Sequence, residues 1–131
     1  MAMDYKYKLV LLIDDSYIDN LISRKILENN YFAEKIEVID SPQRAISHLR
    51  NCLGSKQDIP EVVFLDIRMP EMNGFDFLKE INSIPGIAEQ NIKIFVLSSS
   101  LDPTDLKKIE DHQLVTKFIG KPLSNHALEG I

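Results

Sequence analysis

The sequence predicts an α/β fold: a doubly wound, five-stranded parallel sheet with helices on both faces. Short apolar segments alternate five times with segments of helical periodicity. Each apolar segment is compact and uninterrupted, as expected for a strand that is buried on both faces of a sheet. This alternation is typical of repeated strand–helix units in a parallel sheet.

The first half of the chain contains two of these units. Residues 8–13 (KLVLLI) form the first predicted strand, and Ser16 can cap the helix that follows. The apolar residues of that helix share one helical face: Ile18, Leu21, Ile22 and Ile26. Residues 35–39 form the second strand, and Ser41-Pro42 begins the next helix as an N-cap followed by proline. This helix has an apolar stripe of Ala45, Ile46, Leu49, Cys52 and Leu53.

The second half contains three more units. Its predicted strands cover residues 62–65, 92–97 and 117–119. Apolar side chains mark the third and fourth helices: Phe75, Leu78 and Ile81, then Leu106 and Ile109. Pro103 begins the fourth helix by the same cap-plus-proline rule, and Ser124 can cap a short fifth helix. Loops are expected at residues 54–60 and 84–90.

Length and composition favour one domain over residues 1–131 with no output domain after it. The chain is 44% hydrophobic and 27% charged, which is ordinary for a globular protein. A net charge of -5 argues against a nucleic-acid-binding surface. The single cysteine, Cys52, cannot form an internal disulfide, and no apolar run approaches the ~18 residues of a membrane span. We therefore expect a cytoplasmic protein without membrane insertion.

Polar side chains follow four of the predicted strands. Asp14 and Asp15 come after the first, Asp66 after the third, Ser98 after the fourth and Lys121 after the fifth. The carboxyl ends of parallel strands meet at one edge of a sheet, where ligands bind. Carboxylates about 4 Å apart repel each other by roughly 4 kcal/mol per pair at an effective dielectric of 20, so folding alone would not favour three of them together.

A divalent cation would relieve this repulsion. Mg²⁺ accepts one or two carboxylates, keeps waters and often bridges to a phosphate. A lysine and a hydroxyl at the same edge suit a phosphoryl group, because both donate to its oxygens. An aspartate between metal and lysine can act as a nucleophile toward phosphorus.

These residues resemble the receiver domain of bacterial two-component response regulators, in a single-domain form like the chemotaxis regulator. The resemblance covers nearly the whole chain. It depends on Asp14-Asp15, on Asp66 in the stretch EVVFLDIRMPEMNG, on Ser98 and on Lys121-Pro122, in the order and spacing of the family. It implies a flavodoxin-like (βα)5 fold with strand order 2-1-3-4-5.

The resemblance also implies a role for each acid. Asp66 would accept a phosphoryl group from a sensor histidine kinase or from a histidine phosphotransfer protein. Asp15 and Asp66, with the main-chain carbonyl of Arg68, would bind Mg²⁺, or Mn²⁺ in its place. Asp14 would act through a metal-bound water.

Three other residues complete the implied switch. Lys121 would pair with the phosphoryl oxygens, and Ser98 would donate to one of them and move inward on activation. Phe118 stands where the family has its switch aromatic, and the Lys121-Pro122 peptide is expected to be cis. The face formed by the fourth helix, fifth strand and fifth helix would then change shape, and an unknown output protein would bind it. No direct DNA binding is expected.

The resemblance implies that the chain is not an enzyme in the ordinary sense. It would be a phosphoacceptor switch whose own site catalyses phosphotransfer and slow dephosphorylation. Relay of the phosphoryl group and direct output both remain open.

Departures from the family lie mostly around the site. The sequence has Asn73-Gly74 where Asp-Gly is common, residues 112–115 (HQLV) where Gly-Ala is usual, and Ser98 where Thr is commoner. Arg68 and Ser100 occupy variable positions that tune phosphoryl loss. The hydroxyl could also come from the next residue, Ser99, if the register is shifted by one position.

Other interpretations are also open. Asp66 could be a helix cap, Lys121 a solvated lysine, and Phe118 a core residue. A degenerate receiver that only binds partners would be supported by loss of an acid or of the lysine, and neither is lost. A phosphatase of the haloacid-dehalogenase type needs a second acid two residues after the nucleophile, where this chain has Arg68.

Overall fold

The computed structural model describes residues 4–66, 74–98, 103–129 and 131. Five parallel strands form one sheet in the order β2-β1-β3-β4-β5, as predicted. The strands are β1 (Tyr7–Ile13), β2 (Ala33–Ile39), β3 (Val62–Asp66), β4 (Lys93–Ser98) and β5 (Val115–Gly120). The helices are α1 (Tyr17–Asn29), α2 (Pro42–Ser55), α3 (Gly74–Asn82), α4 (Pro103–Glu110) and α5 (Asn125–Glu129).

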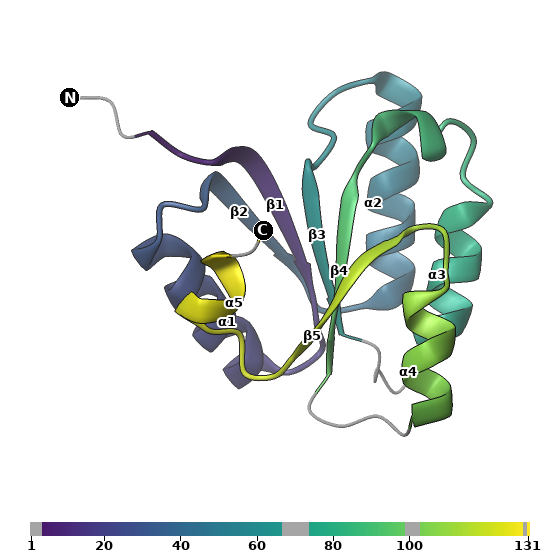
Figure 1. The fold of residues 1–131 in the computed structure, drawn as a ribbon. Coiled ribbons are helices and arrows are strands. Elements are labelled where there is room, and N and C mark those ends of the chain that lie inside the picture. The colour runs from purple at the N-terminus through teal and green to yellow at the C-terminus, as the bar shows by residue number, and fades with distance from the viewer. Residues whose placement is uncertain (1–3, 67–73, 99–102, 130) are drawn as a thin grey trace.

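Helices cover both faces of the sheet, which is why the strands are apolar throughout. Figure 1 shows α1 and α5 on one side and α2, α3 and α4 on the other. One buried cluster joins β1 and β3 to α2 and α3, and includes Leu11, Leu49 and Phe77. A second lies under α1 and α5 and includes Leu12, Leu27 and Phe64. The alternation in the sequence therefore predicted the layers correctly.

Several element boundaries differ from the sequence prediction: β2 begins at Ala33 instead of residue 35, and β5 covers Val115–Gly120 instead of residues 117–119. The second helix continues through Ser55, into residues predicted as loop. It ends only at Lys56, which adopts a left-handed conformation with φ 56° and donates its backbone N–H to the Cys52 carbonyl. The predicted loop at 84–90 contains a short 3₁₀ helix, η1 (Ala88–Gln90).

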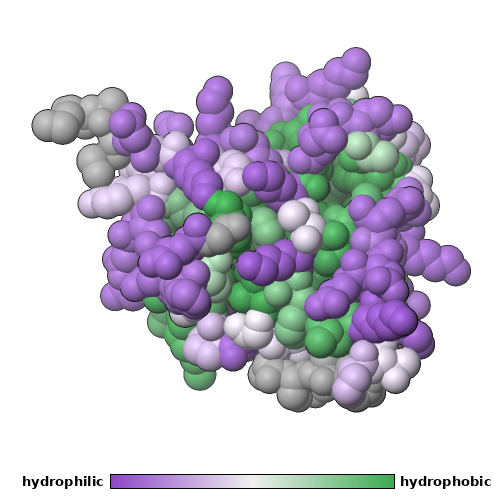
Figure 2. Space-filling view, in the orientation of Figure 1, coloured by the Kyte–Doolittle hydropathy of each residue, from purple (hydrophilic) through white to green (hydrophobic). Residues whose placement is uncertain are grey.

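The predicted apolar face of α1 is wrong. Ile18, Leu21 and Ile22 are 66%, 50% and 41% exposed, and Ile26 is only partly buried. The buried residues of the helix are Asn20, Ser23 and Leu27. The Asn20 side-chain amide donates to the Asp14 carbonyl at 2.8 Å, which turns that face of the helix toward the end of β1. We call Tyr17, Ile18, Leu21 and Ile22 the exposed α1 face, and Figure 2 shows hydrophobic side chains over this helix at the lower left.

No helix within the described ranges has both the length and the apolar character needed to span a membrane.

Candidate functional site

The sheet register brings the polar residues after β1, β3, β4 and β5 to one edge. Ile13 pairs with Leu65, so Asp14 and Asp66 are neighbours at the ends of β1 and β3. On the other side of β3, Ser98 at the end of β4 pairs with Gly120 of β5, directly before Lys121. These ends point downward in Figure 1. The structure thus brings together side chains that are up to 107 positions apart.

Most of these polar groups are withdrawn from solvent. Asp14, Asp66 and Ser98 are 5%, 6% and 1% exposed, whereas Asp15 is exposed. A buried carboxylate is costly unless it is paired or hydrogen-bonded. The burial of two acids at the ends of adjacent strands therefore needs a compensating positive charge.

Three of the acids are close enough to share a cation. Each of Asp14, Asp15 and Asp66 offers a carboxylate oxygen, and these oxygens all lie within 4.8 Å of one another. Oxygens on opposite sides of an octahedral Mg²⁺ lie roughly 4.2 Å apart, because each is about 2.1 Å from the ion. The three carboxylates fit a hard divalent cation.

Lys121 supplies a positive charge to the same cluster. Its Nζ lies 2.7 Å from Asp14 Oδ2, 2.9 Å from Asp19 Oδ2 and 3.6 Å from Asp66 Oδ2. Burial lowers the pKa of the Lys121 ammonium, but the hydrogen bonds to Asp14 and Asp19 and the charge of Asp66 outweigh this and raise it. The lysine is therefore charged over the whole physiological range.

Main-chain contacts fix both ends of this ion pair. The Lys121 N–H donates to the Ser98 carbonyl at 2.9 Å, and the Lys121-Pro122 peptide is cis, as predicted. The Ser16 N–H donates to Asp14 Oδ1 at 2.9 Å. The Asp14 carboxylate is consequently held by the backbone of the α1 N-cap, and the main chain of Lys121 is held by the end of β4.

Sequence reasoning missed two residues that shape the site. Asp19 lies in the first turn of α1, where the Ser16 hydroxyl accepts its N–H, and its carboxylate contacts Lys121. Asn20 ties α1 to the Asp14 carbonyl. One signal was available: both residues lie three or four positions after the predicted N-cap Ser16, which directly follows the acidic pair.

The roles of several predicted residues stay predictions. Phe118 is partly buried and packs against Val96 and Ile109. Arg68, Ser99, Ser100 and Asn73 lie outside the described residues.

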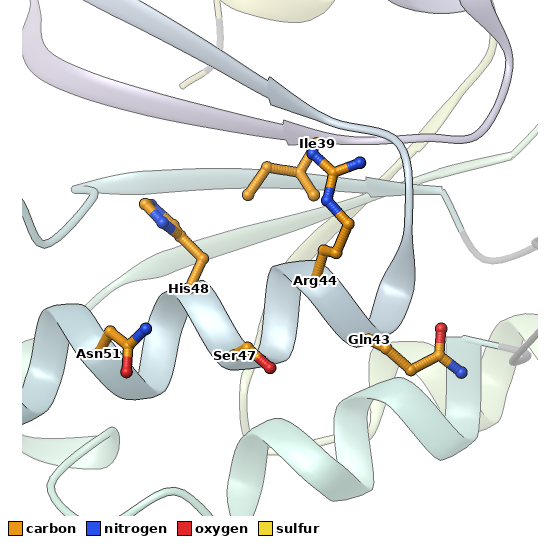
Figure 3. Close-up of a pocket in the computed structure, with 6 residues that line it drawn as sticks. All are labelled: Ile39, Gln43, Arg44, Ser47, His48 and Asn51. Atoms are coloured by element: carbon orange, nitrogen blue, oxygen red, sulfur yellow. The ribbon is translucent and has the colours of Figure 1, made fainter.

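A separate hollow on α2 lies apart from the acidic cluster. It has a volume of about 390 Å³ and, as Figure 3 shows, is lined by Ile39, Gln43, Arg44, Ser47, His48 and Asn51. Nearby, His48 Nε2 is 3.5 Å from Cys52 Sγ and 3.5 Å from Glu37 Oε2. Burial, with the charges of Glu37 and Asp58, raises the pKa of the Cys52 thiol. A buried thiol with a raised pKa is a weak nucleophile, and Cys52 is a core residue, as predicted.

The fold is a doubly wound α/β domain with clustered acids and a lysine at its carboxyl edge, and comparison with known proteins identifies its family. The model of the response regulator receiver domain matches residues 10–130. The chain therefore belongs to the response regulator receiver family and is part of two-component signalling.

Similar proteins and solved structures agree with this family assignment. A two-component response regulator from Cytophaga hutchinsonii superimposes with a TM-score of 0.87 at 30% identity, over 97% of this chain and 94% of that one. A probable methanogenesis regulatory protein, FilR2, of Methanothrix harundinacea is 27% identical over 88% of this chain and 73% of its own length. A protein-glutamate methylesterase/protein-glutamine glutaminase of Burkholderia thailandensis is 34% identical over 93% of this chain, which spans only 31% of that protein.

Proposed function

We propose that the chain is a phosphorylation-controlled switch in which Asp66 accepts a phosphoryl group. One observation carries the proposal: the buried Asp66 carboxylate lies between a lysine ammonium at 3.6 Å and two further carboxylates within 4.8 Å. An aspartate carboxylate in such surroundings can act as a nucleophile toward phosphorus.

Asp15 and Asp66 would hold a magnesium ion, with Asp14 contributing through a water. The predicted fourth ligand, the Arg68 carbonyl, lies outside the described residues. Bound Mg²⁺ supplies positive charge that screens the carboxylates and stabilises the transferring phosphoryl group. Mn²⁺ has similar ligand preferences and would substitute.

The phosphodonor is a phosphohistidine on a kinase or phosphotransfer protein. An Asp66 carboxylate oxygen attacks phosphorus, the N–P bond breaks, and its electron pair returns to the imidazole nitrogen. The product is an acyl phosphate on Asp66. The Lys121 ammonium and the Ser98 hydroxyl donate to the phosphoryl oxygens. Later attack by water at phosphorus breaks the bond between phosphorus and the Asp66 oxygen, which restores the carboxylate and releases inorganic phosphate.

The donor reaches Asp66 across the N-terminal half of α1. The exposed α1 face lies on the same helix whose first turn contacts Lys121 through Asp19. A hollow of about 390 Å³ beside Asp15 is lined partly by Tyr17 and Leu21. A partner that buries these apolar side chains places its histidine over the acidic cluster.

Phosphorylation then changes the face of α4, β5 and α5. The new charge draws Ser98 toward the phosphoryl group, and Phe118 turns into the space that opens. In the structure the ring is partly buried against Val96 and Ile109, the position from which it would turn. A partner that prefers one packing shifts the population toward it.

The test is intact-mass spectrometry after incubation with acetyl phosphate. We expect one phosphoryl adduct that requires Mg²⁺, is lost in Asp66→Asn, and is retained in Asp40→Asn, which removes an exposed acid after β2. No adduct under any condition, including rapid sampling, would contradict the phosphoacceptor role and leave a receiver that only binds partners. An adduct that persists in Asp66→Asn would place the chemistry on another acid.

A further inference from the structure

We infer that Asp19 is a positioning residue that holds Lys121 toward α1 and competes with a phosphoryl group for it. This inference rests on the proposed function of Asp66. The observation behind it is a separate one, because Asp19 is not part of the acidic triad and was not among the site residues predicted from the sequence.

The lysine is shared unequally among three acids. Its Nζ makes hydrogen bonds to Asp14 at 2.7 Å and to Asp19 at 2.9 Å, and only an ion-pair contact to Asp66 at 3.6 Å. An ammonium has three N–H groups, so two of them are committed to groups other than the phosphoacceptor. The ammonium is therefore closer to Asp14 and Asp19 than to Asp66, which would carry the phosphoryl group.

Asp14 and Asp19 differ in their position relative to Asp66. Asp14 lies beside Asp66, within the 4.8 Å triad, so an ammonium can contact Asp14 and a group on Asp66 together. Asp19 is in the first turn of α1 and, among the described acids, is outside that triad. Contact with Asp19 therefore holds the lysine ammonium near α1.

Asp19 is also able to release the lysine. Its side chain is 41% exposed, whereas those of Asp14 and Lys121 are 7% and 13% exposed. Water can replace the ammonium at an exposed carboxylate at little cost. A phosphoryl group on Asp66 carries nearly two negative charges in place of one, and so outcompetes Asp19.

The contact thus stabilises the unphosphorylated state. Losing it should shift the balance toward the phosphorylated one. Exposed ion pairs contribute little free energy, so the expected gain in affinity for a phosphoryl mimic is about two- to fivefold.

The test is calorimetric titration of the full chain with beryllofluoride in the presence of Mg²⁺. Beryllofluoride mimics a phosphoryl group on a carboxylate without forming an acyl phosphate. The variants are Asp19→Asn, which removes the charge, and Asp19→Glu, which restores it. The matched control is Asp40→Asn, since Asp40 is 65% exposed after β2 and pairs with Arg44 at 3.0 Å instead of with Lys121.

We expect Asp19→Asn to bind about two- to fivefold more tightly, with Asp19→Glu and Asp40→Asn within about twofold of the parent chain. Unchanged or weaker binding by a folded Asp19→Asn, while the parent chain binds, would overturn this inference alone. Equal tightening in Asp19→Asn and Asp40→Asn would also overturn it, because general charge repulsion would then explain both. Absence of binding by the parent chain would instead contradict the proposed function. A melting curve of each variant confirms that it is folded.

Discussion

Helices α1 and α2 begin alike in sequence and pack in opposite ways. Each starts at a serine N-cap, Ser16 or Ser41, and each carries apolar residues at helical spacing. In α2 the apolar stripe is buried as predicted, including Leu49 at 1% exposed. In α1 the polar Asn20 is buried and Leu21 is half exposed.

The difference follows from what each helix contacts. Apolar packing against the sheet and against α3 sets the rotation of α2. The rotation of α1 is set at its first turn by polar contacts to the acidic edge: Asn20 to the Asp14 carbonyl and Asp19 to Lys121. A helix that supports a site can thus leave its apolar residues in solvent, where a partner can bury them.

The largest expected effect compares one leucine from each helix. Leu49→Ala should lower the free energy of unfolding by about 2–5 kcal/mol, because it leaves a cavity in the core. Leu21→Ala should change it by less than about 0.5 kcal/mol, because the side chain is already solvated. Urea denaturation of both variants measures the difference, and equal losses would show that α1 buries the predicted face after all.

Removing the charge that joins α1 to β5 should come next. Lys121→Met should lower the free energy of unfolding by about 1–3 kcal/mol without divalent cations, because it removes the ammonium that offsets the charge of the clustered carboxylates. Added Mg²⁺ should restore part of that loss. Lys25→Met, at an exposed position of α1, is the matched control and should have little effect.

The same lysine predicts a pH dependence with a definite sign. Its pKa is raised in the folded state above the ordinary 10.5, so folding favours the protonated form. Its contribution is complete below pH 10.5 and is lost as the pH rises through the folded value. The difference in free energy of unfolding between the parent chain and Lys121→Met should stay constant from neutral pH to pH 10.5. Above pH 10.5 it should shrink. A difference that shrinks near neutral pH would contradict the raised pKa.

Asn20→Ala tests the rotation of α1 directly. It should cost about 1–3 kcal/mol, since it leaves a buried carbonyl without its donor. Asn51→Ala, at an exposed position of α2, should stay within about 0.5 kcal/mol. Chemical denaturation compares the two, and equal small losses would remove the physical reason given for the orientation of α1.

The smallest contrast is between the two caps. Ser16 accepts the Asp19 N–H at 3.2 Å and Ser41 accepts the Arg44 N–H at 3.4 Å. Ser16→Ala and Ser41→Ala should each cost about 1 kcal/mol in a thermal or urea melt. Similar losses would confirm that the helices differ in their faces and not in how they start. A loss several times larger at Ser16 would mean that the cap also supports the acidic site.

The sequence predicted those features that local chemistry determines. Uninterrupted apolar strands, serine caps and Pro42 were sufficient for the parallel sheet and for α2, whereas the strand order came from the family resemblance. Asp14, Asp66 and Lys121 could be placed together because parallel strands share an edge. The orientation of α1 and the role of Asp19 could not be predicted in the same way, since both depend on tertiary contacts, one to a carbonyl and one to a lysine 102 positions away.

The most direct test of the account locates the phosphoryl group itself. After acetyl phosphate and Mg²⁺ treatment, borodeuteride reduces an acyl phosphate to an alcohol, which converts aspartate to deuterated homoserine. Mass spectrometry of the tryptic peptides then shows which acid reacted. We predict deuterated homoserine at position 66 alone, in the peptide of residues 57–68. Conversion at Asp14, Asp15 or Asp19, or at no residue, would contradict the account.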